Sequence, residues 1–106
     1  MKLLLTILLT LSLSANAEFV DGNKLHSWLN GEDAEQLIGK GYIAGVFDAF
    51  HGLGHCAPAN VTLGQVTEMT GIALRTNPAT RHQEASLLVL VMLERYWPCP
   101  KKAKTL

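Results

Sequence analysis

The fold depends most on residues 33–58, which read DAEQLIGKGYIAGVFDAFHGLGHCAP. Apolar and small side chains recur here with the spacing of a helix, so the stretch predicts a helix from Asp33 to Phe50 or slightly beyond. Gly52 and Gly54 then predict the end of this helix and the start of a loop. The helical arc expected to face the core holds Leu37, Ile38, Gly41, Tyr42, Gly45, Val46, Ala49 and Leu53.

Two glycines, Gly41 and Gly45, lie in the middle of this arc. Each costs about 1 kcal/mol relative to alanine in a helix interior, so a compensating contact is expected. We expect another backbone to approach closely where the two side chains are missing. An element that is broken near Gly41 is the alternative.

Three further helices are expected. A short one covers residues 24–29, and Asn30-Gly31 ends it with turn-forming residues. Thr62 and Gln65 have the spacing of a capping box, which predicts the start of another helix that ends before Asn77-Pro78.

Thr80 and Gln83 repeat the capping spacing and predict a last helix that begins there and runs to about Trp97, before Pro98. Its apolar residues lie on two opposite sides. A chain this small has too few layers to bury such a helix on both sides, so a homodimer is expected, with a single central helix as the alternative. One side holds Ala85, Leu88, Val89, Met92 and Tyr96, and the other holds Leu87, Leu90 and Val91.

These elements predict an all-α fold, a small four-helix bundle-like domain. Residues 1–17 are set aside as a secretory signal peptide, because a basic start and a short apolar run precede Ala15-Asn16-Ala17, which has the form of a cleavage site. The expected mature domain is residues 18–106, exported and without a membrane segment after cleavage. A retained membrane anchor is the alternative.

Export changes the meaning of the only two cysteines, Cys56 and Cys99. In an oxidising compartment they can form one intramolecular disulfide, whose loop closure is worth about 4 kcal/mol. A metal site and an intermolecular bridge are the alternatives.

Charge and motif content exclude several functions. The 106 residues balance nine Lys and Arg against nine Asp and Glu, which argues against a nucleic-acid footprint. His51 and His55 have the i, i+4 spacing of metal ligands, but the glycines between them disfavour the helix that this geometry requires, so no metal is expected. No catalytic constellation is visible, and we expect neither an enzyme nor a cofactor.

The order of several short motifs resembles the Rap/Tai family of immunity proteins, over about two-thirds of the chain. The resemblance rests on Gly41-Tyr-Ile-Ala-Gly45-Val-Phe-Asp48-Ala49, Cys56-Ala-Pro58 followed by Val61-Thr62, Asn77-Pro78 and Trp97-Pro98-Cys99. It implies a small, exported, all-α protein, often a dimer, that neutralises a peptidoglycan amidase toxin delivered by a type VI secretion system. Binding in the periplasm would block the active-site cleft of the amidase.

The matching positions are expected to be structural rather than toxin-contacting. They comprise the two cysteines together with Gly41, Tyr42, Gly45, Asp48, Pro58, Pro78, Trp97 and Pro98. Many relatives carry a second cysteine pair, where this chain has Trp28-Leu29 and Gly39-Lys40.

Partner contacts are expected on two loops, residues 51–60 and 76–82, because binding residues concentrate on loops. The candidates are His51, His55, Asn60, Arg75, Arg81 and His82, with ordinary solvated surface as the alternative. Two other functions stay open. One is a periplasmic chaperone resembling the acid-stress Hde proteins, and the other is a protein of the same fold without a toxin partner.

Overall fold

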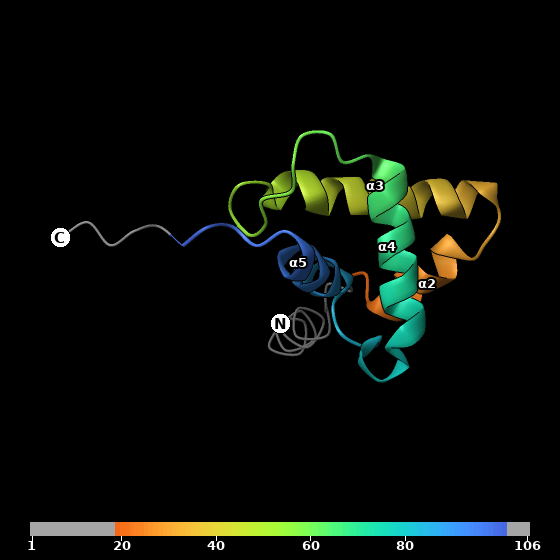
Figure 1. Cartoon of the computed structure of the whole chain (residues 1–106). Coiled ribbons are helices and arrows are strands. Elements are labelled where there is room, and N and C mark those ends of the chain that lie inside the picture. The colour runs from red at the N-terminus through yellow and green to blue at the C-terminus, as the bar shows by residue number, and fades with distance from the viewer. Residues whose placement is uncertain (1–18, 102–106) are drawn as a thin grey trace, which may run out of the picture.

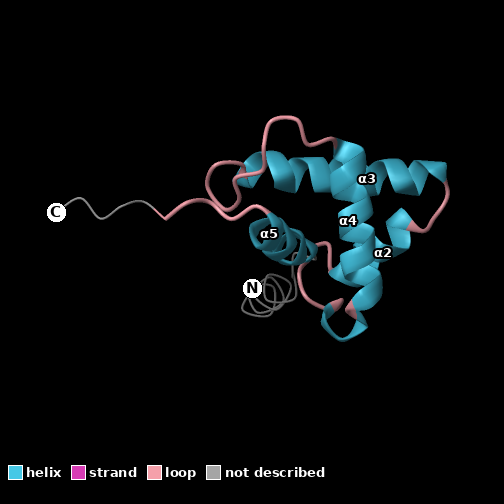
Figure 2. Ribbon diagram, in the orientation of Figure 1, coloured by secondary structure: helices cyan, strands magenta, loops and turns pink. Residues whose placement is uncertain are grey.

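The computed structural model describes residues 19–101. Four α-helices and one 3₁₀ turn form within this range, joined by loops. The helices are α2 Gly22–Leu29, α3 Asp33–Phe50, α4 Leu63–Thr76 and α5 Ala85–Tyr96, and the 3₁₀ turn is η1 Pro78–Thr80. These residues contain no strand (Figure 2), so the all-α prediction is confirmed. The predicted signal peptide lies outside the described residues.

The helices cross one another around a single core. Figure 1 shows α4 lying across α3 rather than along it, with α2 beside the lower part of α4. Every helix contacts the other three. All four therefore contribute buried side chains to one cluster, formed by Leu25, Ile43, Val46, Val66, Leu74, Ala85, Val89, Met92 and Leu93.

Local capping explains where three of the helices begin. The Asp21 carboxylate accepts the backbone N–H of Lys24 at 2.7 Å, before α2. At the start of α4, Thr62 Oγ1 accepts from the backbone N–H of Gln65 at 3.1 Å, and the Gln65 side chain accepts from the Thr62 N–H at 2.8 Å. The predicted capping box is therefore confirmed, and a second one, between Glu32 and Glu35, begins α3.

The predicted start of the last helix is wrong. Thr80 does not cap a helix; its hydroxyl donates to the Asn77 carbonyl within the turn, at 3.2 Å. α5 begins five residues later, at Ala85. The backbone before Ala85 instead pairs with the start of α2. The Arg81 carbonyl accepts the N–H of Asn23 at 2.7 Å, and the Gln83 carbonyl accepts the N–H of Gly22 at 2.9 Å. The predicted end, next to Trp97, is confirmed.

The side of α3 that faces the core differs from the predicted arc. Val46 of that arc is buried as predicted, but the other buried residues of α3 are Gly39 and Ile43, and Leu37 is 71% exposed. Both arcs of this helix are apolar, so periodicity alone could not decide between them. Packing does decide: a Cβ on Gly39 would lie 2.9 Å from Leu29 Cδ2, so the missing side chain admits α2 at this point.

The expected close approach at Gly41 and Gly45 is also absent within the described residues. A Cβ at either position would meet nothing within 4 Å. The glycine that does admit another backbone is Gly22, where an added Cβ would lie 2.7 Å from the Arg81 carbonyl oxygen.

Alanine substitutions at these glycines are expected to have opposite effects. Gly41→Ala and Gly45→Ala should each raise the free energy of unfolding by up to about 1 kcal/mol, because the space is open and alanine favours a helix. Gly22→Ala should lower it by about 1–3 kcal/mol through the clash with Arg81. Urea denaturation of the three variants checks the signs. Destabilisation by Gly41→Ala would mean that another chain packs on α3.

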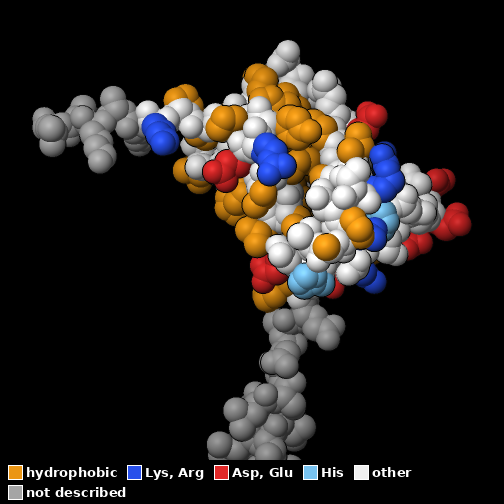
Figure 3. Space-filling model, turned by 60° about the horizontal axis from the view of Figure 1, so that its bottom comes forward, with side chains coloured by type: hydrophobic (Ala, Val, Ile, Leu, Met, Phe, Trp, Pro, Cys, Tyr) orange, Lys and Arg blue, Asp and Glu red, His pale blue; other side chains and the backbone are white. Residues whose placement is uncertain are grey.

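Much apolar surface is left uncovered by this arrangement, and Figure 3 shows hydrophobic side chains gathered on one face. A groove of about 460 Å³ runs between α4 and α5. No helix within residues 19–101 has the combination of length and hydrophobicity that a bilayer span requires. The exposed large apolar side chains that line the groove are Ile72, Leu87, Val91 and Tyr96.

Candidate functional site

In the loop that follows α3, several backbone hydrogen bonds converge on one carbonyl oxygen. The Phe50 oxygen accepts three backbone N–H groups, from Leu53, Gly54 and His55, at 3.0, 2.8 and 3.2 Å. Gly52 has a φ of +80°, which favours glycine, and its N–H donates to the His55 carbonyl at 2.7 Å. The chain therefore turns back on the end of the helix within five residues.

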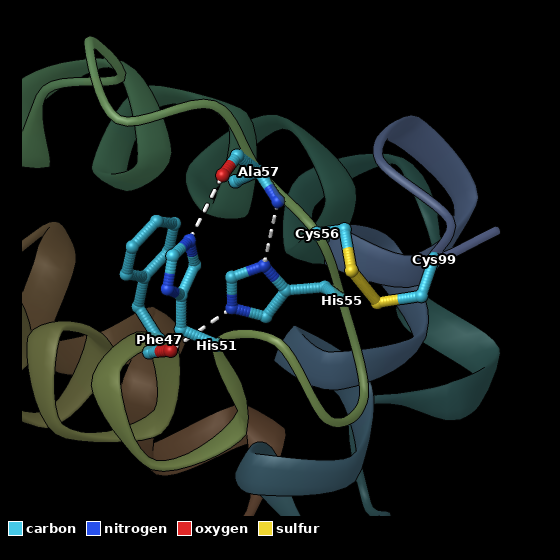
Figure 4. Close-up of a disulfide and its surroundings, with 6 residues drawn as sticks. All are labelled: Phe47, His51, His55, Cys56, Ala57 and Cys99. Carbon is cyan, nitrogen blue, oxygen red and sulfur yellow. Dashed lines mark hydrogen bonds between the residues drawn. A yellow bond between two sulfur atoms is a disulfide. The ribbon is translucent and has the colours of Figure 1, made fainter.

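His55 holds this turn from inside. Its side chain is 0% exposed, and it contacts the ring of Phe47 with 4.5 Å between centroids. The Ala57 N–H can only donate, so Nδ1 accepts it, at 3.2 Å, and Nε2 carries the proton that it donates to the Phe47 carbonyl at 2.9 Å (Figure 4). The neutral Nε2–H form of the imidazole satisfies two buried backbone groups.

This placement corrects the expectation that His55 lies on the partner-binding surface. A fully buried side chain with both nitrogens bonded inside the chain offers nothing to a partner. Its role in this structure is to shape the loop.

His51 lies on the exposed side of the same cluster. Its ring stacks on Phe47 at 5.6 Å between centroids, and its Nε2 bonds the Ala57 carbonyl at 2.9 Å (Figure 4). In both histidines Nε2 is therefore engaged by a main-chain oxygen rather than aimed at a common ion. Among residues 19–101 there is no group of three or more His, Cys, Asp or Glu side chains placed to hold a metal.

The predicted disulfide between Cys56 and Cys99 is confirmed, with 4.8 Å between the two Cα atoms. It joins the loop to the segment after α5, and the Cys56 N–H adds a bond to the Trp97 carbonyl at 2.8 Å. Gly54 sits so close to α5 that an added Cβ would lie 2.7 Å from Leu90 Cδ1. The loop is thus fastened to both α3 and α5.

Leu53 lies at the tip of this fastened loop, with 82% of its surface exposed. Leu53 was predicted on the inward arc of the helix, so its exposed position corrects that prediction. The signal that could have found it is the pair of flanking glycines, which remove Leu53 from the helix that ends at Phe50. Asn60, further along the loop, is exposed as expected.

The two predicted loops do not come together. They lie at opposite ends of α4 (Figure 1), whose 14 residues span about 21 Å. At the far end Arg75 and His82 are exposed and Arg81 is half-buried. With His55 buried, the other five candidate residues therefore belong to two separate regions, one at each end of α4.

One further residue, His26 of α2, is half-buried and has a shifted pKa. Burial lowers its pKa below the usual 6.5, and the positive charges of Arg81 and Arg75 lower it further. Backbone hydrogen bonds bring the start of α2 to the Arg81 segment, since the Arg81 carbonyl accepts the N–H of Asn23 at 2.7 Å. Sequence analysis did not single out His26, because its position along the chain is remote from both arginines.

The motif positions of the resemblance are mostly on the surface. Tyr42 and Trp97 are half-buried, and the Tyr42 ring lies 6.4 Å from that of Trp28. The remaining six are exposed: Gly41, Gly45, Asp48, Pro58, Pro78 and Pro98.

Comparison with known proteins identifies one family. The family model described as Rap1a immunity proteins matches residues 21–99, which include all four described helices and both cysteines. A comparison with curated proteins finds no match.

Proposed function

The chain belongs to the Rap1a immunity protein family, and from this membership we propose that it binds and occludes a peptidoglycan amidase toxin delivered by a type VI secretion system. The observation that carries the proposal is the extent of the family match, from the cap of α2 to the disulfide. The chain would act by steric blockage and supply no chemistry of its own.

The occluding element that we propose is the loop of residues 51–60. It protrudes at one end of α4, and the disulfide and the His55 hydrogen bonds hold its shape. A loop that is ordered before binding loses less conformational entropy when it enters a cleft. Leu53 supplies an apolar side chain at its tip, suited to an apolar recess in the partner.

Export to the periplasm and a homodimeric state are parts of the same proposal. A disulfide persists in an oxidising compartment, which supports a periplasmic location after removal of residues 1–17. The exposed apolar side chains of α4 and α5 support a second copy as a covering surface. Sedimentation equilibrium of the purified chain tests the dimer.

Substitution of Leu53 tests the proposed binding loop. Leu53→Asp should weaken the affinity for the amidase by about thirtyfold or more, because it places a charge at the tip that enters the partner. Leu37→Asp is the matched control, since Leu37 is 71% exposed on α3. The affinity of this variant for the amidase should equal that of the wild-type chain. Calorimetric titration with the purified amidase measures both. Equal affinities for the two variants would exclude the tip of the loop from the contact.

A further inference from the structure

A small recess opens beside the loop of residues 51–60, between the last two turns of α3 and the first turn of α4. Its volume is about 260 Å³. Pockets that hold a whole small molecule have volumes of about 300–1,000 Å³, so this recess is better suited to a single side chain. Its apolar lining residues are Ala44, Phe47, Val61, Leu63 and Val66.

The walls of the recess are held in place by contacts within the chain. The Phe47 ring stacks on His51, with 5.6 Å between centroids, and contacts the buried His55 ring at 4.5 Å. On the opposite wall, the Val61 N–H donates to the Pro58 carbonyl at 3.2 Å. The recess is therefore formed before a partner binds, which lowers the entropy lost on binding.

One charged side chain, Asp48, lines the recess. It is exposed, and an exposed aspartate carries a full negative charge at neutral pH. The start of α4 also borders the recess, and this end of a helix carries only about half a positive charge. The recess therefore has a net negative charge beside an apolar wall.

We propose that the recess receives a lysine side chain of a protein partner, with the ammonium group at Asp48 and the methylene stem against the apolar wall. Lysine has both properties that the recess requires, because its long stem packs on apolar surface while its charged end stays at the rim. Arginine suits the recess less well, because a guanidinium brings five donors to a site lined by one carboxylate. A metal ion would require several oxygen ligands, and no group of three or more acidic, histidine or cysteine side chains is placed for one within residues 19–101.

The proposed function supplies the partner. The recess and Leu53 belong to the same end of α4, where the loop joins this helix to α3 (Figure 1), so one partner surface can contact both. The lysine would add a charged contact to the apolar one at Leu53 and would fix the orientation of the partner. The identity of the partner as the amidase rests on the proposed function, whereas the geometry of the recess does not.

Asp48→Asn tests the charge, because it keeps the size of the side chain. In calorimetric titration at low salt, this variant should bind the captured amidase about tenfold more weakly than the wild-type chain. The difference should shrink at high salt, which screens the wild-type pair. Asp33→Asn is the matched control, because Asp33 is exposed at the opposite end of α3, about 22 Å away. Equal affinities of Asp48→Asn and the wild-type chain overturn the proposal.

Filling the recess tests the insertion of a side chain. Ala44→Leu adds bulk to the apolar wall and leaves Asp48 in place, so it should weaken binding of the amidase by a similar factor. Gly45→Leu is the control, because Gly45 does not line the recess and its added Cβ would meet nothing within 4 Å. Circular dichroism establishes that both variants are folded. A folded Ala44→Leu variant with full affinity overturns the proposal.

A probe that requires no amidase tests the recess itself. A short peptide with one lysine is added to the full chain, purified from the periplasm, and the methyl resonances of Val61 and Leu63 are followed by NMR. The lysine peptide should shift these resonances. The same peptide with its lysine acetylated, which keeps the stem and removes the charge, should not, and neither should the lysine peptide added to Asp48→Asn. No shift with the lysine peptide, or equal shifts with both peptides, overturns the proposal.

The outcomes separate this site from the proposed function. A chain that inhibits an amidase equally well with Asp48→Asn retains the function and loses the recess as a site. A chain that inhibits no amidase but binds the lysine peptide through Asp48 retains the site and loses the proposed partner.

Discussion

Replacement of Cys56 and Cys99 together by serine is expected to lower the free energy of unfolding by about 4 kcal/mol. The bridge joins residues that are 43 positions apart, and its loss frees this loop in the unfolded chain. In the folded chain, the Cys56 N–H bond to the Trp97 carbonyl would still join these two segments. Small domains rarely have more than a few kcal/mol to lose, so the variant should be largely unfolded at 37 °C.

Urea denaturation measures this loss. The wild-type chain is compared with and without a reductant, and the double serine variant serves as the control because reductant can no longer act on it. Reduced wild type and the variant should share one lowered midpoint. A midpoint that does not change on reduction would show that the bridge contributes nothing to stability.

Replacement of His55 by leucine is expected to cost about 3 kcal/mol. Leucine fills much of the volume of the imidazole, but it cannot form hydrogen bonds. The Phe47 carbonyl and the Ala57 N–H therefore both lose their bond to the side chain. Leaving a buried polar group unsatisfied costs about 1–3 kcal/mol. His55→Asn can restore the acceptor near Nδ1, and His55→Gln can restore the donor near Nε2, so each should recover part of the loss.

His51→Leu is the matched control for this prediction. His51 is exposed and makes one bond, to the Ala57 carbonyl, so its loss should cost less than about 1 kcal/mol. Hydrogen exchange of the Ala57 amide distinguishes the mechanisms, because only the His55 variants free that N–H. If His51→Leu and His55→Leu were equally destabilised, the buried hydrogen bonds would not explain the loss.

Local signals in the sequence predicted the fold well where a single interaction decides the outcome. The Thr62 and Gln65 pair predicted the start of α4, and the confirmed disulfide follows from two cysteines in a chain with an expected export signal. The same capping pattern at Thr80 wrongly predicted the start of a helix, because the backbone that follows Thr80 pairs with the start of α2. Such a long-range pairing leaves no mark in the local pattern.

The candidate site was predictable only in part, for a similar reason. The glycines between His51 and His55 indicated a loop, but not that one imidazole is exposed and the other fully buried. Which imidazole is buried depends on the orientation of α3 about its own axis. Periodicity does not fix this orientation, because both arcs of the helix are apolar. The pairing of residues 22–23 with the carbonyls of Arg81 and Gln83 also depends on tertiary packing, which one sequence without its fold does not reveal.

We propose that this chain inhibits a peptidoglycan amidase by binding it. A type VI amidase effector is first recovered by capture on the chain purified from the periplasm, and is then purified. The rate at which this effector hydrolyses peptidoglycan is measured as the chain is added in increasing amounts. Hydrolysis should fall to background at a stoichiometric amount of chain, and Leu53→Asp should shift the inhibition curve while Leu37→Asp should not. If the chain retains no hydrolase and instead binds unfolded proteins at low pH, it is not an amidase inhibitor and a chaperone function takes the place of inhibition.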